Sequence, residues 1–111
     1  MELHEKNCIL STKETPALNL EQKTSMLELI NSEWQLTHSN TRLFRDFKFN
    51  KFIPALEFAN QIGSLAEQQR HHPEIHIGWG HCGIEIWTHT INELVESDFI
   101  LAAKIDRLYR D

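Results

Sequence analysis

Histidines are concentrated in one short stretch of the chain. The stretch from His71 to His89, HHPEIHIGWGHCGIEIWTH, holds five of the seven histidines. An imidazole titrates near neutral pH and also binds metals, so such a stretch can transfer protons or hold an ion. It also contains the letters GxGxxG, a pattern of dinucleotide-binding loops. Three kinds of site therefore have to be weighed: a dinucleotide loop, a metal centre and a proton-transfer site.

The glycine pattern does not indicate a dinucleotide site. Such a loop needs its glycines between a strand and a helix, where backbone N–H groups and the helix N-terminus face the pyrophosphate. Gly78, Gly80 and Gly83 instead lie between two segments in which apolar residues alternate, which is typical of a β-hairpin. We interpret these glycines as residues that serve the bend of the hairpin.

The spacing does not favour a metal centre either. Adjacent residues of an extended chain point to opposite sides, so His71 and His72 are poorly placed to bind the same ion. His76 and His81 have no partner at a spacing that would make them converge, and the chain has no CxxC or HExxH motif. The sequence therefore predicts no metal and no other cofactor.

Proton transfer is the remaining chemistry. Two or three histidines can act together as acid and base near neutral pH. Pro73 biases His72 toward an extended backbone and so defines where the rings of the His-His pair point. A pocket between a helix end, this turn and a strand end would gather Glu67, the pair and His89. Spacing alone leaves a second interpretation equally open, in which these are ordinary surface and core histidines.

The elements that would position these residues follow from the hydrophobic pattern. Residues 1–18 are polar and irregular, and we expect a loosely attached segment followed by a single domain over 19–111. Apolar residues three and four apart predict helices, and alternating ones predict strands. The first expected element is a helix from Asn19 to Asn31 with Leu20, Leu27 and Ile30 on one face, followed by a strand from Trp34 and a strand over 43–49. A second helix is expected over 51–69, and strands over 75–79 and 84–88 are joined by a turn at Gly80-His81. The last expected element is a helix through Leu101 and Leu108, capped by Ser97 or Asp98.

This order predicts an α+β fold, in which an antiparallel four-stranded sheet carries helices packed on one face.

The composition excludes several classes of partner and location. The net charge of −5 argues against a nucleic-acid partner, and no apolar segment approaches the length needed to cross a membrane. No export signal is visible, and two cysteines, Cys8 and Cys82, are too few for a disulfide framework. We therefore expect a cytoplasmic protein.

Several of these residues together resemble the pterin-4a-carbinolamine dehydratase family, in particular its bacterial members. The resemblance covers about residues 20–108 without an obvious gap. It is carried by Glu67-x-x-x-His71-His72-Pro73, by Thr88-His89 seventeen residues beyond His72, by the run from Asp98 to Asp106 (DFILAAKID), and upstream by Trp34 and the run from Phe47 to Ala59 (FKFNKFIPALEFA).

The resemblance implies an enzyme that removes water from a 4a-hydroxytetrahydropterin. Its product is the quinonoid dihydropterin, so the family recycles the pterin cofactor of aromatic amino acid hydroxylases. By position, His71 and His89 match the histidines proposed to act near the 4a-hydroxyl, and His72 matches the one proposed for the ring-nitrogen proton. Neighbouring positions match supporting residues, namely the carboxylates Glu67 and Asp98 and the turn residue Pro73. Trp87 and Trp79 are candidates for the walls of the pocket, and packing on a face of the sheet is an equally open interpretation of each.

The resemblance also leaves alternatives and departures. Family members assemble as dimers or tetramers, so a homo-oligomer is expected, and some animal members serve as non-catalytic dimerisation partners. A different pterin, of molybdopterin or folate type, is a further alternative. Residues 91–95 lack the Gly and Ser/Thr often found before the last helix, which leaves the position of Asp98 open. Cys82-Gly83 suggests a strand that starts late or carries a bulge.

Overall fold

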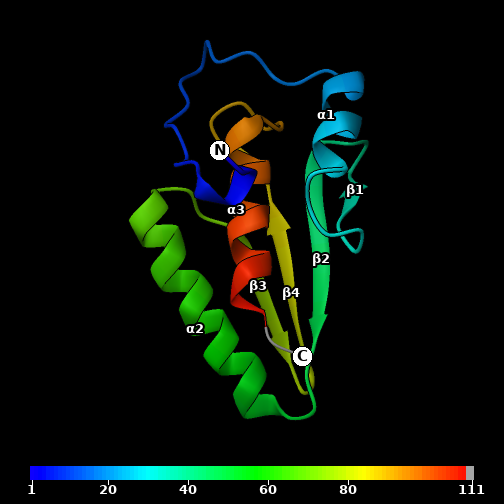
Figure 1. Ribbon diagram of the computed structural model, residues 1–111, viewed down its shortest axis with the longest axis vertical. Helices are drawn as coiled ribbons and strands as arrows, with labels where there is room; N and C mark the ends of the chain where they lie inside the picture. The colour runs from blue at the N-terminus through cyan, green and yellow to red at the C-terminus, as the bar shows by residue number, and fades with distance from the viewer. Residues whose placement is uncertain (110–111) are drawn as a thin grey trace.

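The computed structural model describes residues 1–109 and contains three α-helices, one short 3-10 helix and four strands (Figure 1). The sheet order is β1-β2-β4-β3, and every neighbouring pair is antiparallel. This confirms the predicted α+β fold. In chain order the elements are η1 (Leu3–Glu5), α1 (Leu20–Leu27), β1 (Gln35–Thr37), β2 (Arg42–Lys48), α2 (Phe52–Gln69), β3 (Glu74–Gly78), β4 (His81–Ile86) and α3 (Glu96–Leu108).

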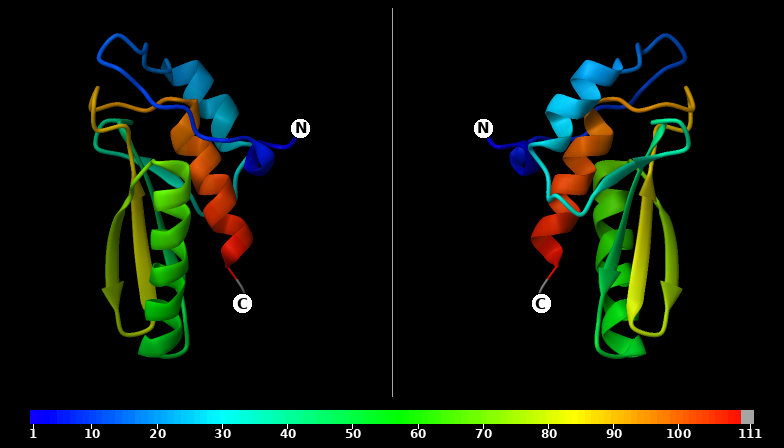
Figure 2. Two further views of the ribbon diagram at one scale, coloured as in Figure 1. Left: turned by 90° about the vertical axis from the view of Figure 1, so that its left-hand side faces the viewer. Right: turned by 90° about the vertical axis from the view of Figure 1, so that its right-hand side faces the viewer.

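Helices α2 and α3 lie on the same face of the sheet (Figure 2). On β2, alternate residues from Leu43 to Phe47 are buried and their neighbours are only partly covered, which gives the sheet one core face. Helix α2 supplies small and apolar residues at helical spacing against that face, among them Ala55, Ile62 and Ala66. Pro54 lies in the first turn of α2, where its missing N–H costs little. The core therefore holds the C-terminal end of α2 firmly against the sheet.

Helix α1 begins as predicted and ends early. The Asn19 side chain accepts a hydrogen bond from the Gln22 backbone N–H, and the Gln22 side-chain oxygen accepts one from the Asn19 backbone N–H. The helix ends at Leu27, four residues before Asn31, and Leu20 is exposed, so the predicted apolar face is wrong at that position. The buried residue of α1 is Lys23, because its ammonium group has partners elsewhere in the fold.

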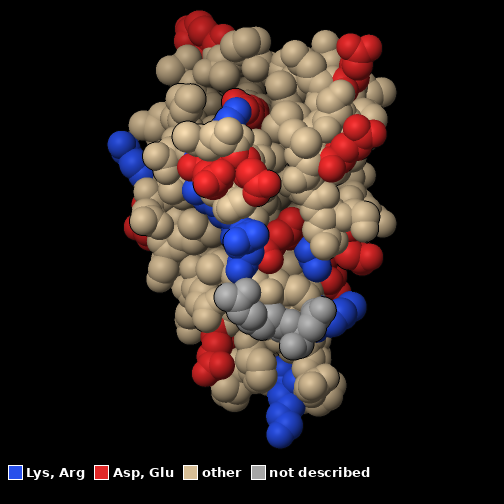
Figure 3. Space-filling view, in the orientation of Figure 1, with Lys and Arg blue, Asp and Glu red and all other residues tan. Residues whose placement is uncertain are grey.

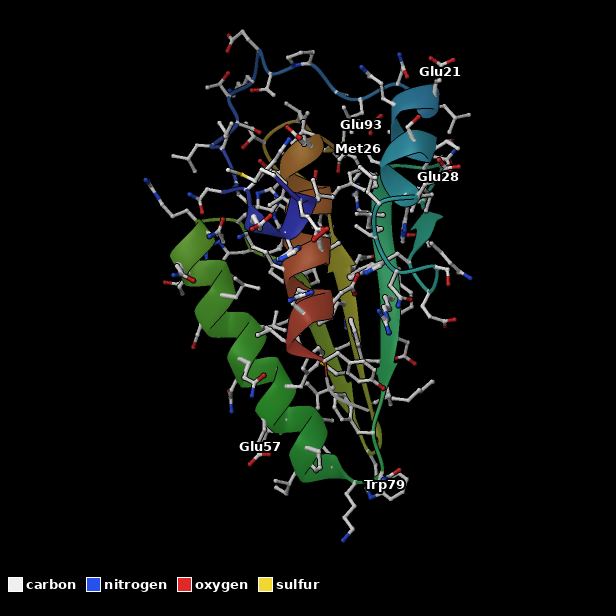
Figure 4. The ribbon with its side chains drawn as sticks, viewed as in Figure 1. Glu21, Met26, Glu28, Glu57, Trp79 and Glu93 are labelled. Atoms are coloured by element: carbon white, nitrogen blue, oxygen red, sulfur yellow. The ribbon has the colours of Figure 1, made fainter. Side chains whose placement is uncertain are left out.

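The β3–β4 hairpin turns one residue earlier than predicted. Gly78 pairs with His81, so the loop consists of Trp79 and Gly80, and Gly80 has the positive φ of 78° that favours glycine. Strand β4 starts at His81 and pairs regularly with β3 as far as Glu85, so the late start or bulge expected at Cys82 is wrong. Trp79 is exposed at the hairpin tip (Figure 4), and it is not among the residues that line the cavity described below.

Helix α3 begins at Glu96, with Val95 as the residue that precedes its first turn. The Asp98 carboxylate reaches back and accepts a hydrogen bond from the Val95 N–H at 2.8 Å. Asp98 therefore caps the helix from its third position rather than from the N-cap position, and Ser97 has other partners. Among residues 1–109, no helix is both long and apolar enough to span a membrane.

Candidate active site

A cavity of about 250 Å³ lies where α2 ends and β4 ends, and it gathers the predicted histidines. His71, His72 and His89 all line it, together with Trp87. The remaining lining residues are Leu10, Ser11, Arg70, Thr88 and Thr90. The other predicted site residues, Glu67, Pro73 and Asp98, do not line the cavity but contact or adjoin its histidines. Segments that are far apart in the sequence thus form one concave site.

The end of helix α2 directs the two adjacent histidines. Arg70 adopts the left-handed conformation (φ 56°, ψ 40°), which ends the helix. The His71 N–H still bonds the Ala66 carbonyl at 3.2 Å, so His71 is held against the last helical turn. Pro73 then prevents any return to helix. The chain therefore leaves α2 sharply, and His71 and His72 reach different surroundings.

His71 is backed by a buried carboxylate. Its Nε2 lies 2.6 Å from Oδ1 of Asp98, whose side chain is fully buried. The other oxygen of Asp98 accepts hydrogen bonds from the Thr88 hydroxyl and the Val95 N–H, each at 2.8 Å. Because Asp98 acts as acceptor in these contacts, we assign the proton of the first contact to His71 Nε2. Asp98 thereby fixes the ring of His71 and leaves Nδ1 to accept a proton or a hydrogen bond.

His72 has a similar partner in a different setting. Its Nε2 lies 2.5 Å from Oε2 of Glu67, which is in the last turn of α2. Both side chains are exposed, so solvent screens this pair and its geometry is less constrained than that of His71 and Asp98. The carboxylate still accepts from Nε2, which leaves Nδ1 of His72 free to exchange a proton.

His89 is held by stacking. Its ring lies parallel to that of Trp87, with 4.4 Å between centroids and 15° between planes. The Arg42 guanidinium lies over the same indole, 4.1 Å from its centroid, and donates a hydrogen bond to Asn92 Oδ1 at 2.7 Å. This cation–π contact fixes the indole on which His89 rests.

The loop that carries His89 is closed at its base. Thr88 and Glu93 pair through two backbone hydrogen bonds, and Asn92 takes a positive φ of 53° between them. Glu93 in turn binds the buried ammonium group of Lys23, at 2.9 Å, so α1 holds this loop (Figure 4 labels Glu93). Burial raises the pKa of Glu93, but hydrogen bonds from Lys23 and the Leu94 backbone and the charges of Lys23 and Arg42 outweigh it and lower that pKa.

The other two histidines of the stretch lie away from the cavity. His81 binds Asp46 at 3.0 Å, and His76 is exposed on β3. Within residues 1–109, no group of three or more His, Cys, Asp or Glu side chains is placed to hold a metal ion. On the face seen in Figure 3, basic and acidic side chains are interspersed, and neither kind forms a continuous patch.

Sequence reasoning assigned no role to Arg42 or to the hydroxyl of Thr88, nor to the other lining residues Leu10, Ser11, Arg70 and Thr90. Arg42 and the hydroxyl of Thr88 act through Trp87 and Asp98, contacts that depend on strand register and on the packing of α3. Leu10 and Ser11 come from a segment without periodic pattern, so no signal placed them at the cavity. A motif search could have found only Thr88, as the neighbour of His89.

Together the fold and the cavity define a class of protein: an α+β domain whose small pocket can move protons on a bound ligand. Imidazoles from two segments face one space, and one of them is oriented by a buried carboxylate. The family model described as pterin 4 alpha carbinolamine dehydratase matches residues 16–108. The chain therefore belongs to the pterin-4a-carbinolamine dehydratase family, as the sequence motifs predicted.

Individual relatives agree with this membership. A protein of Rickettsia canadensis, named "Putative pterin-4-alpha-carbinolamine dehydratase", is 46% identical over 104 residues, which cover 94% of each chain. The crystal structure of a transcriptional coactivator/pterin dehydratase from Brucella melitensis superposes with a TM-score of 0.78 at 27% identity, over 84% of this chain and 98% of that one. A pterin dehydratase-like RuBisCO assembly factor of the alpha-carboxysome, 23% identical with a TM-score of 0.59 over 68% of this chain and 91% of that one, shares the fold.

Proposed function

We propose that this protein dehydrates 4a-hydroxytetrahydropterins to quinonoid dihydropterins and so recycles the pterin cofactor of aromatic amino acid hydroxylases. The observation that carries the proposal is the convergence of His71, His72 and His89 on one cavity, with Asp98 buried behind His71. Family membership supplies the substrate class. The cavity of about 250 Å³ suits a small ligand, since pockets for drug-sized molecules usually measure about 300–1,000 Å³.

The reaction requires two proton movements. The bond between C4a and the hydroxyl oxygen breaks, and the oxygen leaves as water after it accepts a proton. The proton on N5 is lost, and its electron pair forms the C4a=N5 double bond. In the proposal His71 and His89 act at the leaving oxygen, and His72 takes the N5 proton through Nδ1. Each well-placed acid or base typically contributes about 10²–10⁴ in rate.

Asp98 is a positioning residue in this scheme. It orients His71 and balances the charge that the ring carries when protonated, and Thr88 holds the carboxylate in turn. Glu67 has the same function for His72 in a more exposed setting. Trp87 provides a flat apolar surface at the cavity on which His89 also rests.

Two alternatives stay open to test. A non-catalytic interaction module would not need the histidine set, whereas here three histidines and their carboxylate partners are present and ordered around a cavity. A different pterin, of molybdopterin or folate type, would use the same pocket with another substituent.

The test is a stopped-flow measurement of 4a-hydroxytetrahydropterin dehydration by the purified protein. We expect the rate to rise in proportion to protein concentration, and to fall for a His71→Gln/His89→Gln variant that remains folded by circular dichroism. A rate equal to that of buffer alone would exclude the dehydratase and favour the interaction module. Turnover of only a folate- or molybdopterin-type substrate would favour the second alternative.

A further inference from the structure

The segment that precedes the family match contributes to the wall of the cavity. The family model begins at residue 16, yet Leu10 and Ser11 line the cavity beside the histidines. Figures 1 and 2 show the segment running from η1 along α3 and then over the end of the molecule where that helix begins. We call residues 6–11 the N-terminal strap.

The strap is fixed to the first turn of α3. The buried hydroxyl of Ser97 accepts a hydrogen bond from the Ile9 N–H at 2.8 Å and donates one to the Ile9 carbonyl at 3.2 Å. The Cys8 thiol donates to the Ser97 carbonyl at 3.4 Å. Ser97 directly precedes Asp98, so the strap is attached next to the carboxylate that orients His71. The strap is therefore not the loosely attached segment expected from its sequence.

A second attachment joins the strap to the end of α2. The side-chain oxygen of Gln69 accepts a hydrogen bond from the Cys8 N–H at 2.8 Å, and its amide nitrogen donates to Asn7 at 3.3 Å. Lys6 binds Glu96 at 2.9 Å. The two helix ends that present His71 and Asp98 thus also hold the strap, which gives Leu10 and Ser11 a defined position relative to the histidines.

Leu10 has the character of a ligand contact. This residue is 58% exposed although its side chain is large and apolar, and it lies at the cavity rather than in the core. A bound molecule that covered Leu10 would gain the free energy of removing this apolar surface from water. Ser11 adds a hydroxyl beside it. This pair matches a short alkyl substituent that carries hydroxyl groups.

We infer that the strap forms a specificity wall, in which Leu10 and Ser11 contact the substituent on the pterin ring while the histidines act at C4a and N5. The inference rests on the proposed dehydratase function. The strap then contributes to binding and to the choice of pterin, and not to the proton transfers. Removing the contact between the strap and the substituent should raise KM and leave kcat unchanged, because this contact binds the substrate and the transition state equally well.

The test compares two neighbouring residues of the strap with two substrates. Leu10→Ala removes the cavity contact, and Ile9→Ala is the matched control, because Ile9 is apolar, adjacent and 73% exposed but does not line the cavity. The substrates are the 4a-hydroxy forms of a tetrahydropterin with a dihydroxypropyl substituent and of one that carries only methyl groups.

For the dihydroxypropyl substrate, we expect Leu10→Ala to raise KM about five- to tenfold, as the loss of part of a buried leucine contact predicts. For the methyl substrate, and for Ile9→Ala with either substrate, KM should change less than about twofold, as at an uninvolved surface site. The value of kcat should stay within about twofold throughout.

Ser97→Ala tests the attachment. Like Leu10→Ala, it should raise KM for the dihydroxypropyl substrate. The double variant should have a KM little above that of Leu10→Ala, because both changes act through the same wall. Equal KM values for Leu10→Ala and Ile9→Ala in an active protein would overturn the inference, as would a fall in kcat for Leu10→Ala at unchanged KM. A parent protein without any turnover would overturn the proposed function, and the inference with it.

Discussion

At the scale of single residues, the adjacent histidines are chemically unequal. The His71 side chain is 11% exposed and faces a fully buried carboxylate, whereas His72 is 57% exposed and its partner Glu67 is 78% exposed. A buried hydrogen bond to a carboxylate that two other donors also hold fixes the orientation of the ring far better than an exposed pair does. We therefore expect His71 to depend strongly on its carboxylate and His72 to depend on Glu67 only weakly.

His89 provides the first prediction. Replacing His89 with Gln should slow dehydration by about 10- to 10³-fold, because it removes a proton-transfer group from the cavity. The fold should be nearly unaffected, since His89 is exposed and its loop is closed by backbone hydrogen bonds between Thr88 and Glu93. The measurement is the dehydration rate across neutral pH, with thermal unfolding as the check on stability. Wild-type rates throughout would show that His89 has no part in the reaction.

The adjacent pair provides the second prediction. His71→Gln and His72→Gln should each lower the rate, and the double variant should lose less than the product of the two single losses, because the two groups serve one reaction. His76→Gln and His81→Gln are the controls, since both residues belong to the same stretch but lie outside the cavity. These controls should change the rate less than about threefold. If either is as damaging as His72→Gln, the site has been assigned to the wrong histidines.

The sequence could predict the site residues that belong to a local motif, but not those whose position depends on contacts between segments far apart in the chain. The three site histidines and Asp98 could be selected because they match positions of the family's motifs, whereas the spacing of the histidines alone left their role open. Arg42 could not be selected, because its position over Trp87 depends on how β2 pairs with β4, where Leu43 lies opposite Ile86. Trp79 was a candidate for the pocket wall only while the position of the hairpin turn was unknown.

At the scale of elements, periodicity predicted the order and type of every helix and strand from α1 to α3, but not which residue α1 buries or where the β3–β4 hairpin turns. Helix α1 buries Lys23 rather than Leu20 because the ammonium group of Lys23 pairs with Glu93, which lies 70 residues further along the chain in the loop of His89. No local pattern carries that information. The turn of the β3–β4 hairpin was displaced by one residue because Trp79-Gly80 and Gly80-His81 both satisfy the glycine requirement.

The pair of Lys23 and Glu93 provides the third prediction. The pKa of Glu93 is lowered from its usual 4.5, so this group contributes stability that is present above pH 4.5 and is lost as the pH falls through the lowered value. Glu93→Gln should therefore reduce stability at pH 7 and flatten its decline in acid. The measurement is urea unfolding between pH 3 and 7, with Glu21→Gln on the exposed side of α1 as control. An unchanged acid profile would show that the pair does not hold the loop.

At the scale of the whole molecule, the reaction proposed here needs only proton transfer. The fourth prediction is that activity survives exhaustive chelation, because the proposed steps use imidazoles and carboxylates alone. The measurement is the dehydration rate before and after dialysis against a chelator, with metal analysis of the active protein. Stoichiometric metal together with a loss of rate on its removal would contradict the proposed mechanism. The expected dimer or tetramer stays a prediction that light scattering can check.

An ion pair between the buried Arg45 and the partly buried Asp106 connects several elements of the fold. Asp106 on α3 accepts hydrogen bonds at 2.8 Å from Arg45 of β2 and from the Trp34 indole, and one at 3.1 Å from the Asn31 backbone. The Arg45 guanidinium also lies over the Phe47 ring, 4.1 Å from its centroid. Burial raises the pKa of Asp106, although Trp34, Asn31 and Arg45 each oppose this. The carboxylate is thus held among three donors, and its charge is the counterion of the Arg45 guanidinium.

The fifth prediction concerns this pair. Asp106→Asn keeps the shape and one acceptor oxygen but leaves the Arg45 charge buried without a counterion, so it should destabilise the protein by about 3 kcal/mol. Arg45→Met/Asp106→Asn removes both charges, and it should cost less than Asp106→Asn alone because no uncompensated charge remains. The measurement is the free energy of unfolding in urea, with Glu57→Gln on the exposed side of α2 (Figure 4) expected to stay within about 0.5 kcal/mol. A double variant less stable than Asp106→Asn would show that the charge of Arg45 is satisfied without Asp106, and that the contact of Arg45 with Phe47 stabilises the fold more than the ion pair does.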